Sequence, residues 1–209
     1  LISEEEVTKL AIDCLKSDVQ LAVHAIGDAA VTHVLNAFES ARAALPDKHH
    51  VPLRLEHAQV VKPEDRMRFA EHHIIASMQP THAVSDGPWA PDRLGSERMP
   101  WAYSFKALKS AGATLAFGSD FPVEDHNPSF GLLAAYQEGC EPETCLSPDE
   151  ALLAFTTGCA HATGSTLSTA TLPTGIPADL TFWERTDQQP FPFKPVATMV
   201  GGIVVWSAR

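Results

Sequence analysis

The stretch VQLAVHAI at residues 19–26 gives the clearest indication of the fold. It is short, apolar and β-prone, so it predicts a strand, and the polar residue His24 falls near its end. Apolar residues then recur at helical spacing over residues 29–44, and Asp28 is predicted to cap that helix. A strand followed directly by an amphipathic helix is the first half of a βαβ unit.

The same alternation recurs further along the chain. Ser3 and Glu6 form a capping-box pattern that predicts a helix before the first strand. A long proline-rich loop that contains Trp89 and Pro91 is predicted after residue 78, and residues 94–99 are too polar to assign. Strands are predicted at residues 51–61 (VPLRLEHAQVV), 74–78 (IIASM) and 113–117 (ATLAF), and helices at residues 63–73, 101–110, 131–138 and 148–157. Alternation of this kind predicts an α/β fold with a parallel sheet of right-handed βαβ units.

The last forty residues have a different pattern. Residues 175–183 (GIPADLTFW) and 197–206 (ATMVGGIVVW) are β-prone, and Gly201-Gly202 lies between two apolar runs, which is a hairpin signal. We therefore predict an α/β domain over residues 1–170 and a separate β segment over residues 171–209.

Composition excludes several classes of partner. With 26 acidic and 15 basic residues the net charge is -11, and an acidic surface repels phosphate backbones, so no nucleic-acid partner is expected. No apolar run is long enough to span a bilayer, so no membrane partner is expected. The four cysteines form no CxxC pair and are predicted to be reduced, which favours a cytoplasmic location.

Polar side chains occur where the predicted strands end, which is where parallel βα architectures bind ligands. His57 follows His24 by 33 residues, and Asp120 follows His57 by 63 residues. Since an eight-unit βα barrel uses about 31 residues per unit, these spacings correspond to one unit and two units. Two imidazoles and a carboxylate suit a zinc-like divalent cation, so His24, His57 and Asp120 are predicted metal ligands.

Other interpretations of these residues stay open on the sequence alone. Each His can be a hydrogen-bonded core residue, and Asp120, after Gly118-Ser119, can cap a turn. A serine hydrolase is disfavoured because Ser119 in GSDF lacks one glycine of the GxSxG elbow. Glu56 should point away from His57 by strand alternation and form a structural ion pair.

The segment after the third predicted strand is a predicted substrate lid. Four of its side chains are expected to contact substrate, and the alternative is a plain packed loop. These residues are Gln79, His82, Asp86 and Trp89.

Several motifs resemble the amidohydrolase superfamily, in particular its family of YtcJ-like and N-substituted-formamide-deformylase-like enzymes. The tail is similar to that family's closing β segments. The motifs are VHAIGD (23–28), LEHAQ (55–59), SMQPTH (77–82), FGSDFPV (117–123), GIPADLTFWE (175–184) and TMVGGIVVW (198–206).

The resemblance implies a fold, a reaction and roles for three residues. The fold would be the C-terminal half of a TIM barrel, strands five to eight, plus a small β-sandwich portion at the C-terminus. His24 and His57 would be metal ligands, and Asp120 would be both a ligand and the catalytic general base. The implied reaction is hydrolysis of a carbon–nitrogen bond in a small amide-type substrate, assisted by one or two divalent ions, with zinc expected.

The sequence departs from the family in one large respect. The family's first strand supplies an HxH pair of ligands, and no HxH occurs here. We therefore expect a fragment that is weakly active or inactive, with two open edge strands and an exposed apolar inner face. It would need the missing N-terminal barrel half or self-association. The alternative function is a non-catalytic half barrel that acts as an oligomerising or binding module.

Overall fold

The computed structural model describes residues 2–138, 144–164, 174–185 and 193–208. They belong to two compact units, Leu1–Leu167 and Ser168–Arg209, which are treated separately below. The domain boundary predicted after residue 170 lies outside the described residues.

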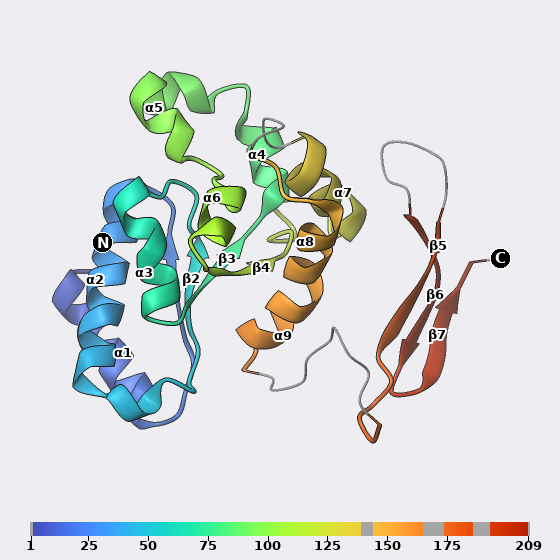
Figure 1. Ribbon diagram of the computed structural model, residues 1–209, viewed down its shortest axis with the longest axis horizontal. Coiled ribbons are helices and arrows are strands. Elements are labelled where there is room, and N and C mark those ends of the chain that lie inside the picture. Colours follow the sequence, from blue (N-terminus) through green and yellow to red (C-terminus); the bar gives the residue numbers. More distant parts are fainter. Residues whose placement is uncertain (1, 139–143, 165–173, 186–192, 209) are drawn as a thin grey trace. The chain divides into compact units, whose positions relative to one another are not determined.

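The first unit is built on a four-stranded parallel sheet (Figure 1). Its strands follow chain order: β1 (Leu21–Ala25), β2 (Leu53–His57), β3 (Ile74–Met78) and β4 (Thr114–Phe117). All three strand pairs are parallel. The predicted α/β class with a parallel sheet is confirmed.

The helices before β3 form largely as predicted. The capping box is present at the start of α1 (Glu4–Lys16), where Ser3 and Glu6 bond each other's backbone N–H groups. The prediction for Asp28 is wrong, because Gly27 is the N-cap of α2 (Asp28–Ala44) and Asp28 is its first helical residue. The connections are η1 (Pro46–Lys48), η2 (Pro63–Asp65) and α3 (Arg66–Glu71).

The long loop predicted after β3 is instead largely helical. It contains α4 (Pro80–Asp86), α5 (Ala90–Arg98) and η3 (Met99–Trp101), followed by α6 (Phe105–Ser110). Pro80 and Pro91 suggested a loop, but both lie in the first turn of a helix, where the missing N–H leaves no bond unmade. Gly95, with φ of 71°, kinks α5.

One face of the sheet is buried under helices. Figure 1 shows α2 and α3 on this side, and the two helices and α6 contact β2, β3 and β4. The strands contribute Leu53, Leu55, Ile74 and Met78, and the helices contribute Phe38, Phe69 and Phe105, all almost completely buried. Burial of each such side chain stabilises the fold by about 2 kcal/mol.

The outer edge of β4 is covered, so the expectation of an open edge there is wrong. The covering helices come from a segment with α7 (Pro128–Leu133), η4 (Ala134–Glu138), α8 (Pro148–Leu153), η5 (Ala154–Gly158) and α9 (Cys159–Ala162). A Cβ on Gly158 would lie 1.9 Å from the Leu115 carbonyl oxygen, which shows how closely η5 approaches the strand. The Cys159 thiol donates to the Phe117 carbonyl oxygen at 3.2 Å.

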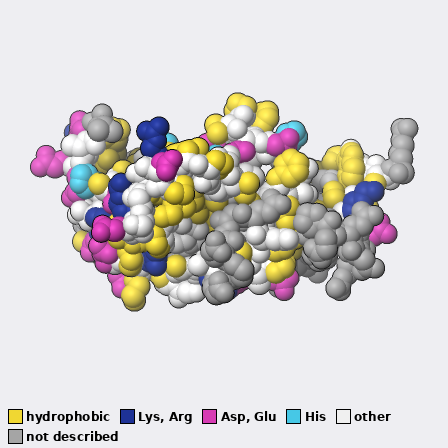
Figure 2. All heavy atoms as spheres, turned by 90° about the horizontal axis from the view of Figure 1, so that it is seen from above, with side chains coloured by type: hydrophobic (Ala, Val, Ile, Leu, Met, Phe, Trp, Pro, Cys, Tyr) yellow, Lys and Arg dark blue, Asp and Glu magenta, His cyan; other side chains and the backbone are white. Residues whose placement is uncertain are grey.

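The second face of the sheet is not the exposed apolar surface that the sequence suggested. Arg54 and Glu56 form an ion pair on it at 2.6 Å, which also confirms the structural role expected for Glu56. Ile75 packs there with Ala116 and the helical residue Ala162. Exposed apolar side chains lie elsewhere, for example at Phe121 and Val123, and the space-filling view shows others scattered among charges (Figure 2).

The cysteine prediction holds in part. Cys14 and Cys159 carry free thiols, whereas Cys145 is disulfide-bonded, so the expectation of a reduced thiol is wrong at that position. Among the helices in the described ranges, none combines the length and apolar character that a bilayer crossing requires.

The second unit contains an antiparallel sheet of β5 (Leu180–Arg185), β6 (Phe193–Val200) and β7 (Ile203–Ser207). The predicted hairpin turn is present, with φ of 55° at Gly201 and 83° at Gly202, a region that favours glycine. The Gly201 N–H donates to the Asp179 carboxylate at 2.7 Å, which fixes the turn. The β character of the tail is confirmed, while the second layer that a sandwich needs is not among the described strands.

Candidate functional site

The structure brings two of the three predicted metal ligands together. His24 lies on β1 and His57 ends the neighbouring strand β2. Their ring centres are 4.4 Å apart, with the ring planes at 69°. Two imidazoles that share one zinc ion have ring centres about 5 Å apart, because each ligating nitrogen lies about 2 Å from the ion. The spacing of this ring pair therefore suits a shared ion.

A left-handed backbone turn at His57 makes this pairing possible. Strand register places His24 beside Glu56, and strand alternation would send His57 to the opposite face. His57 instead has φ of 74°, followed by φ of 46° at Ala58. Non-glycine residues adopt this region at a cost of about 1–2 kcal/mol each. Such strain is concentrated at functional sites, where the surroundings hold it in place.

The environment of His57 favours the neutral imidazole. Burial, followed by the neighbouring His24, lowers the pKa of His57, while the Asp120 carboxylate and Gln79 act in the opposite direction. No hydrogen bond of ordinary geometry joins His57 to Gln79, and the His57 Nδ1 atom is buried without a partner among the described residues. A neutral ring with an unpartnered nitrogen is the form that ligates metals.

Asp120 lies in the turn after β4 and is exposed. It has φ of 57° and is close enough to influence the pKa of His57. Within the described ranges, however, no three His, Cys, Asp or Glu side chains converge tightly enough to hold one ion. The donor types and the His24–His57 spacing fit a divalent metal, and the third donor is not in ligating position.

Two of the four predicted substrate residues line the same region. Gln79 directly precedes α4 and His82 lies on it; they are 9% and 8% exposed. The His82 ring stacks on His57, with centres 6.0 Å apart and planes at 14°. The Gln79 Oε1 and His82 Nε2 atoms are buried and unpartnered among the described residues. Buried polar atoms without partners are rare and call for an explanation, such as a water or a bound molecule.

The other two predicted substrate residues behave differently. Trp89 is 50% exposed just before α5, with no fixed role in the core. Asp86 accepts hydrogen bonds from Gln59 and Tyr103. Neither partner was expected from the sequence: residues 101–110 were predicted to be helical, whereas Tyr103 lies in a turn before α6, and no local pattern indicates its proximity to Asp86.

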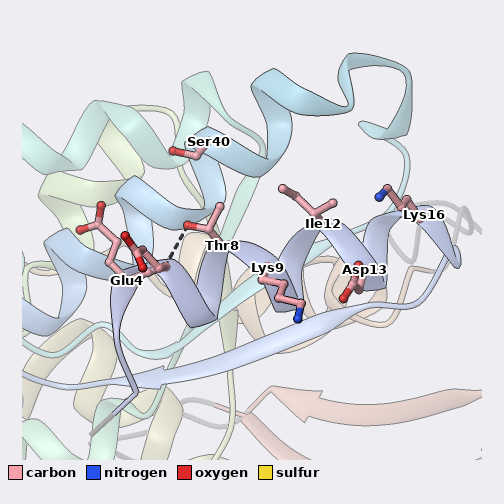
Figure 3. A pocket seen from close by; sticks show the side chains of 8 residues that line it. Glu4, Thr8, Lys9, Ile12, Asp13, Lys16 and Ser40 are labelled. Atoms are coloured by element: carbon pink, nitrogen blue, oxygen red, sulfur yellow. Dashed lines mark hydrogen bonds between the residues drawn. The ribbon is translucent and has the colours of Figure 1, made fainter.

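Two hollows among the described residues lie away from this region. Figure 3 shows one of about 510 Å³ along α1, where Glu4, Lys9, Asp13 and Lys16 alternate in charge. Another, of about 300 Å³, lies where β3 and β4 begin, and its lining includes His49, His50, His73 and His161. Neither is lined by His24, His57 or Asp120.

Comparison with known proteins gives consistent matches. A sequence model of the amidohydrolase family matches residues 1–206. A protein of Arabidopsis thaliana named "Protein LONG AFTER FAR-RED 3" is 36% identical over 170 residues, which is 78% of this chain and 29% of the relative. "Putative amidohydrolase YtcJ" of Bacillus subtilis (strain 168) is 35% identical over 187 residues, which is 85% of this chain and 35% of the relative.

A solved structure matches as well. An uncharacterized metal-dependent hydrolase from Pyrococcus furiosus superimposes with a TM-score of 0.70 at 34% identity, covering 78% of this chain and 33% of that protein. The chain thus spans about a third of the length of the relatives that it matches.

Proposed function

The chain belongs to the amidohydrolase family, and on that premise we propose that it is part of a metal-dependent hydrolase that cleaves carbon–nitrogen bonds in small amide-type molecules. The observation that carries this proposal is the His24–His57 ring pair at the carboxyl ends of two adjacent parallel strands, 4.4 Å apart. That end of a parallel sheet is where ligands bind in this class of fold.

We propose that His24 and His57 hold one divalent ion, zinc in the first instance, and that Asp120 is a further ligand. Two imidazoles and a carboxylate are donors that zinc accepts. A second ion is compatible with this family assignment. The metal, when bound, polarises the substrate carbonyl as a Lewis acid. A complete ligand set needs donors beyond the described residues, and we propose that a further barrel segment supplies them.

The chain's own residues then divide the remaining tasks. Asp120, which is exposed in the turn after β4, is the general base that takes a proton from the attacking water. The buried, unpartnered Gln79 Oε1 and His82 Nε2 atoms orient the substrate by hydrogen bonds. The exposed Trp89 ring contacts its apolar part. His57 stays neutral beside the reacting groups because its pKa is lowered by burial and by His24.

The alternative is a non-catalytic half barrel that assembles with itself or with another chain. It is favoured by β1, an edge strand of the described sheet on which Ala22 and His24 are exposed. An unpaired strand edge is a template for pairing with another strand. This alternative predicts an oligomer that binds no metal tightly and hydrolyses no amide.

The experiment compares the purified chain, and any longer natural protein that contains it, with the single variants His24→Ala, His57→Ala and Asp120→Asn. Metal content is measured by mass spectrometry, and hydrolysis is measured on a panel of N-formyl and N-acyl amines. We expect bound zinc that both His variants lose, and hydrolysis that Asp120→Asn lowers by 100-fold or more, on the order of the usual contribution of a general base. Metal-free protein with no hydrolysis of the panel would refute the proposal.

A further inference from the structure

The loop that follows His57 is held by a small, partly buried network of hydrogen bonds. Gln59, 9% exposed, and Tyr103, 8% exposed, are polar residues in the core. The Gln59 amide donates to Asp86 Oδ2 at 2.6 Å and also contacts the Tyr103 hydroxyl. The Tyr103 hydroxyl donates to the same Asp86 oxygen. Asp86 thus satisfies the polar groups of the two buried side chains, Gln59 and Tyr103, as burial requires.

Main-chain hydrogen bonds connect the loop after His57 to two other segments. The Tyr103 N–H donates to the Gln59 carbonyl at 2.8 Å, and Val60 forms an antiparallel bridge with Ala102. On the other side, the Ala58 N–H donates to the Ala25 carbonyl at 3.1 Å, next to His24. The loop is thus tied both to the strand that carries His24 and to the segment that carries Tyr103.

These main-chain hydrogen bonds lie where the backbone is strained. His57, Ala58 and Tyr103 have φ values of 74°, 46° and 49°. Left-handed conformations at three non-glycine residues persist only where surrounding contacts determine them. Without such contacts, His57 would return to the strand geometry that points it away from His24.

Asp86 ends α4, the helix that carries His82. No lysine or arginine pairs with its carboxylate among the described side chains. Its hydrogen bonds in the network come from two neutral donors, Gln59 and Tyr103. Burial, followed by Asp86, raises the pKa of Tyr103, which keeps its hydroxyl protonated and able to donate. Hydrogen bonds to an ionised acceptor are about twice as strong as neutral ones.

We propose that Gln59, Asp86 and Tyr103 form a positioning clamp that holds the strained loop after His57 against the end of α4. Asp86 then acts on the His57 ring through Gln59 and is a positioning residue, in contrast to the substrate contact that the sequence suggested. The clamp also fixes His82 opposite His57. The clamp rests on the proposed function only in its consequence for metal binding, since the loop geometry can be measured without a metal.

The test compares three clamp variants with a matched control. Asp86→Ala removes the acceptor, Asp86→Asn keeps an oxygen but loses the charge, and Tyr103→Phe removes one donor. Ser85→Ala is the control, because Ser85 precedes Asp86 on α4 and its hydroxyl bonds Glu124 and, weakly, the His82 main chain, but none of the three clamp residues. Hydrogen exchange is measured at the Ala58, Val60 and Tyr103 amides, and Co²⁺ binding is followed by its absorption spectrum.

We expect exchange at those three amides to rise about 10-fold or more in Asp86→Ala, less in Asp86→Asn and Tyr103→Phe, and not in Ser85→Ala. Amides of β3 should keep their protection, which separates loop release from general unfolding. Where the chain binds Co²⁺, the dissociation constant should rise about 10-fold in Asp86→Ala, as for other groups that orient a metal ligand, with a changed spectrum.

Unchanged exchange in the clamp variants, or an equal rise in Ser85→Ala, would overturn the clamp. If Asp86→Ala does not fold, the exchange rates of the three amides in Asp86→Asn and Tyr103→Phe are compared with those in Ser85→Ala. Rates above the control support the clamp, and equal rates overturn it. A wild-type chain that binds no Co²⁺ contradicts the proposed function, and the exchange data then judge the clamp alone. Loss of hydrolysis in Asp86→Asn with normal exchange and Co²⁺ binding would instead assign Asp86 to the substrate.

Discussion

The rings of His24 and His57 have their centres 4.4 Å apart, although the strand register pairs His24 with Glu56. A second ring pair, His49 and His73, lies near the start of β3 with centres 5.2 Å apart. The two pairs offer similar spacings, so they provide a matched test of which one binds metal.

Zinc should stabilise the chain through the first pair. A ligand that binds only the folded state at a hundred times its Kd adds about 2.7 kcal/mol to the free energy of unfolding. We expect a zinc-dependent rise in Tm that disappears in His24→Ala and His57→Ala and persists in His49→Ala. Thermal unfolding with and without Zn²⁺ measures this. Loss of the rise only in His49→Ala would place the metal at the other end of the sheet.

Gly158 should tolerate no side chain. A Cβ there would lie 1.9 Å from the Leu115 carbonyl oxygen, so Gly158→Ala must push η5 away from β4 and weaken the cover on that edge. The expected loss of stability is about 3 kcal/mol, at the upper end for overpacking. Gly118→Ala is the control, because nothing lies within 4 Å of its Cβ position. Urea unfolding should separate the two variants, and equal stabilities would contradict the packing described.

Arg42 should be among the most costly polar residues to replace. It is 2% exposed and donates to three carbonyl oxygens, those of Lys48, Val51 and His72, at 2.7 to 3.2 Å. Burial lowers the pKa of Arg42, but the guanidinium remains charged at neutral pH. Arg42→Met would leave those carbonyls unpaired and cost about 3 kcal/mol.

The control for Arg42 is Arg93→Ala, a change at an exposed arginine that should stay within about 0.5 kcal/mol of the unchanged chain. Free energies of unfolding from urea titration compare the two. An Arg42→Met variant as stable as Arg93→Ala would show that the three bonds contribute nothing net.

Glu150 should stabilise the chain in a pH-dependent way. Lys106, at 2.8 Å, and the Ser147 backbone N–H lower the pKa of Glu150 below its ordinary value of 4.5. Because the folded state has the lower pKa, the contribution is fully present above the unfolded value and is lost as the pH falls through the folded value. Glu150→Gln should cost up to about 1 kcal/mol at pH 7, and the difference should vanish in acid.

Unfolding of the two proteins at neutral pH and near pH 3 measures this effect. Ser147→Ala removes the hydroxyl that accepts from the Glu150 N–H, so it should cost about 1 kcal/mol at pH 7 and keep most of that cost near pH 3. A deficit of Glu150→Gln that is equally large in acid would show that its charge is not the source.

Prediction from the sequence succeeded where local pattern and burial agree. Residues 74–78 are apolar and bounded by polar residues, and they form β3 with the predicted ends. It failed where one residue type has two uses. Proline in residues 79–100 suggested a loop, yet Pro80 and Pro91 begin helices. The cover on β4 was missed because Gly158 and Cys159 give no sign in sequence of the strand that they meet.

The sequence by itself determined the α/β class, the order of strands and which polar residues follow them, because apolar periodicity and strand-end position are local properties. Only the tertiary structure decided which of those residues meet. Left-handed turns bring His57 to His24 and Gln59 to Tyr103 and Asp86, while Asp120 stays exposed. The physical reason is that a backbone angle of this kind is imposed by contacts between segments far apart in the chain, which no local pattern records.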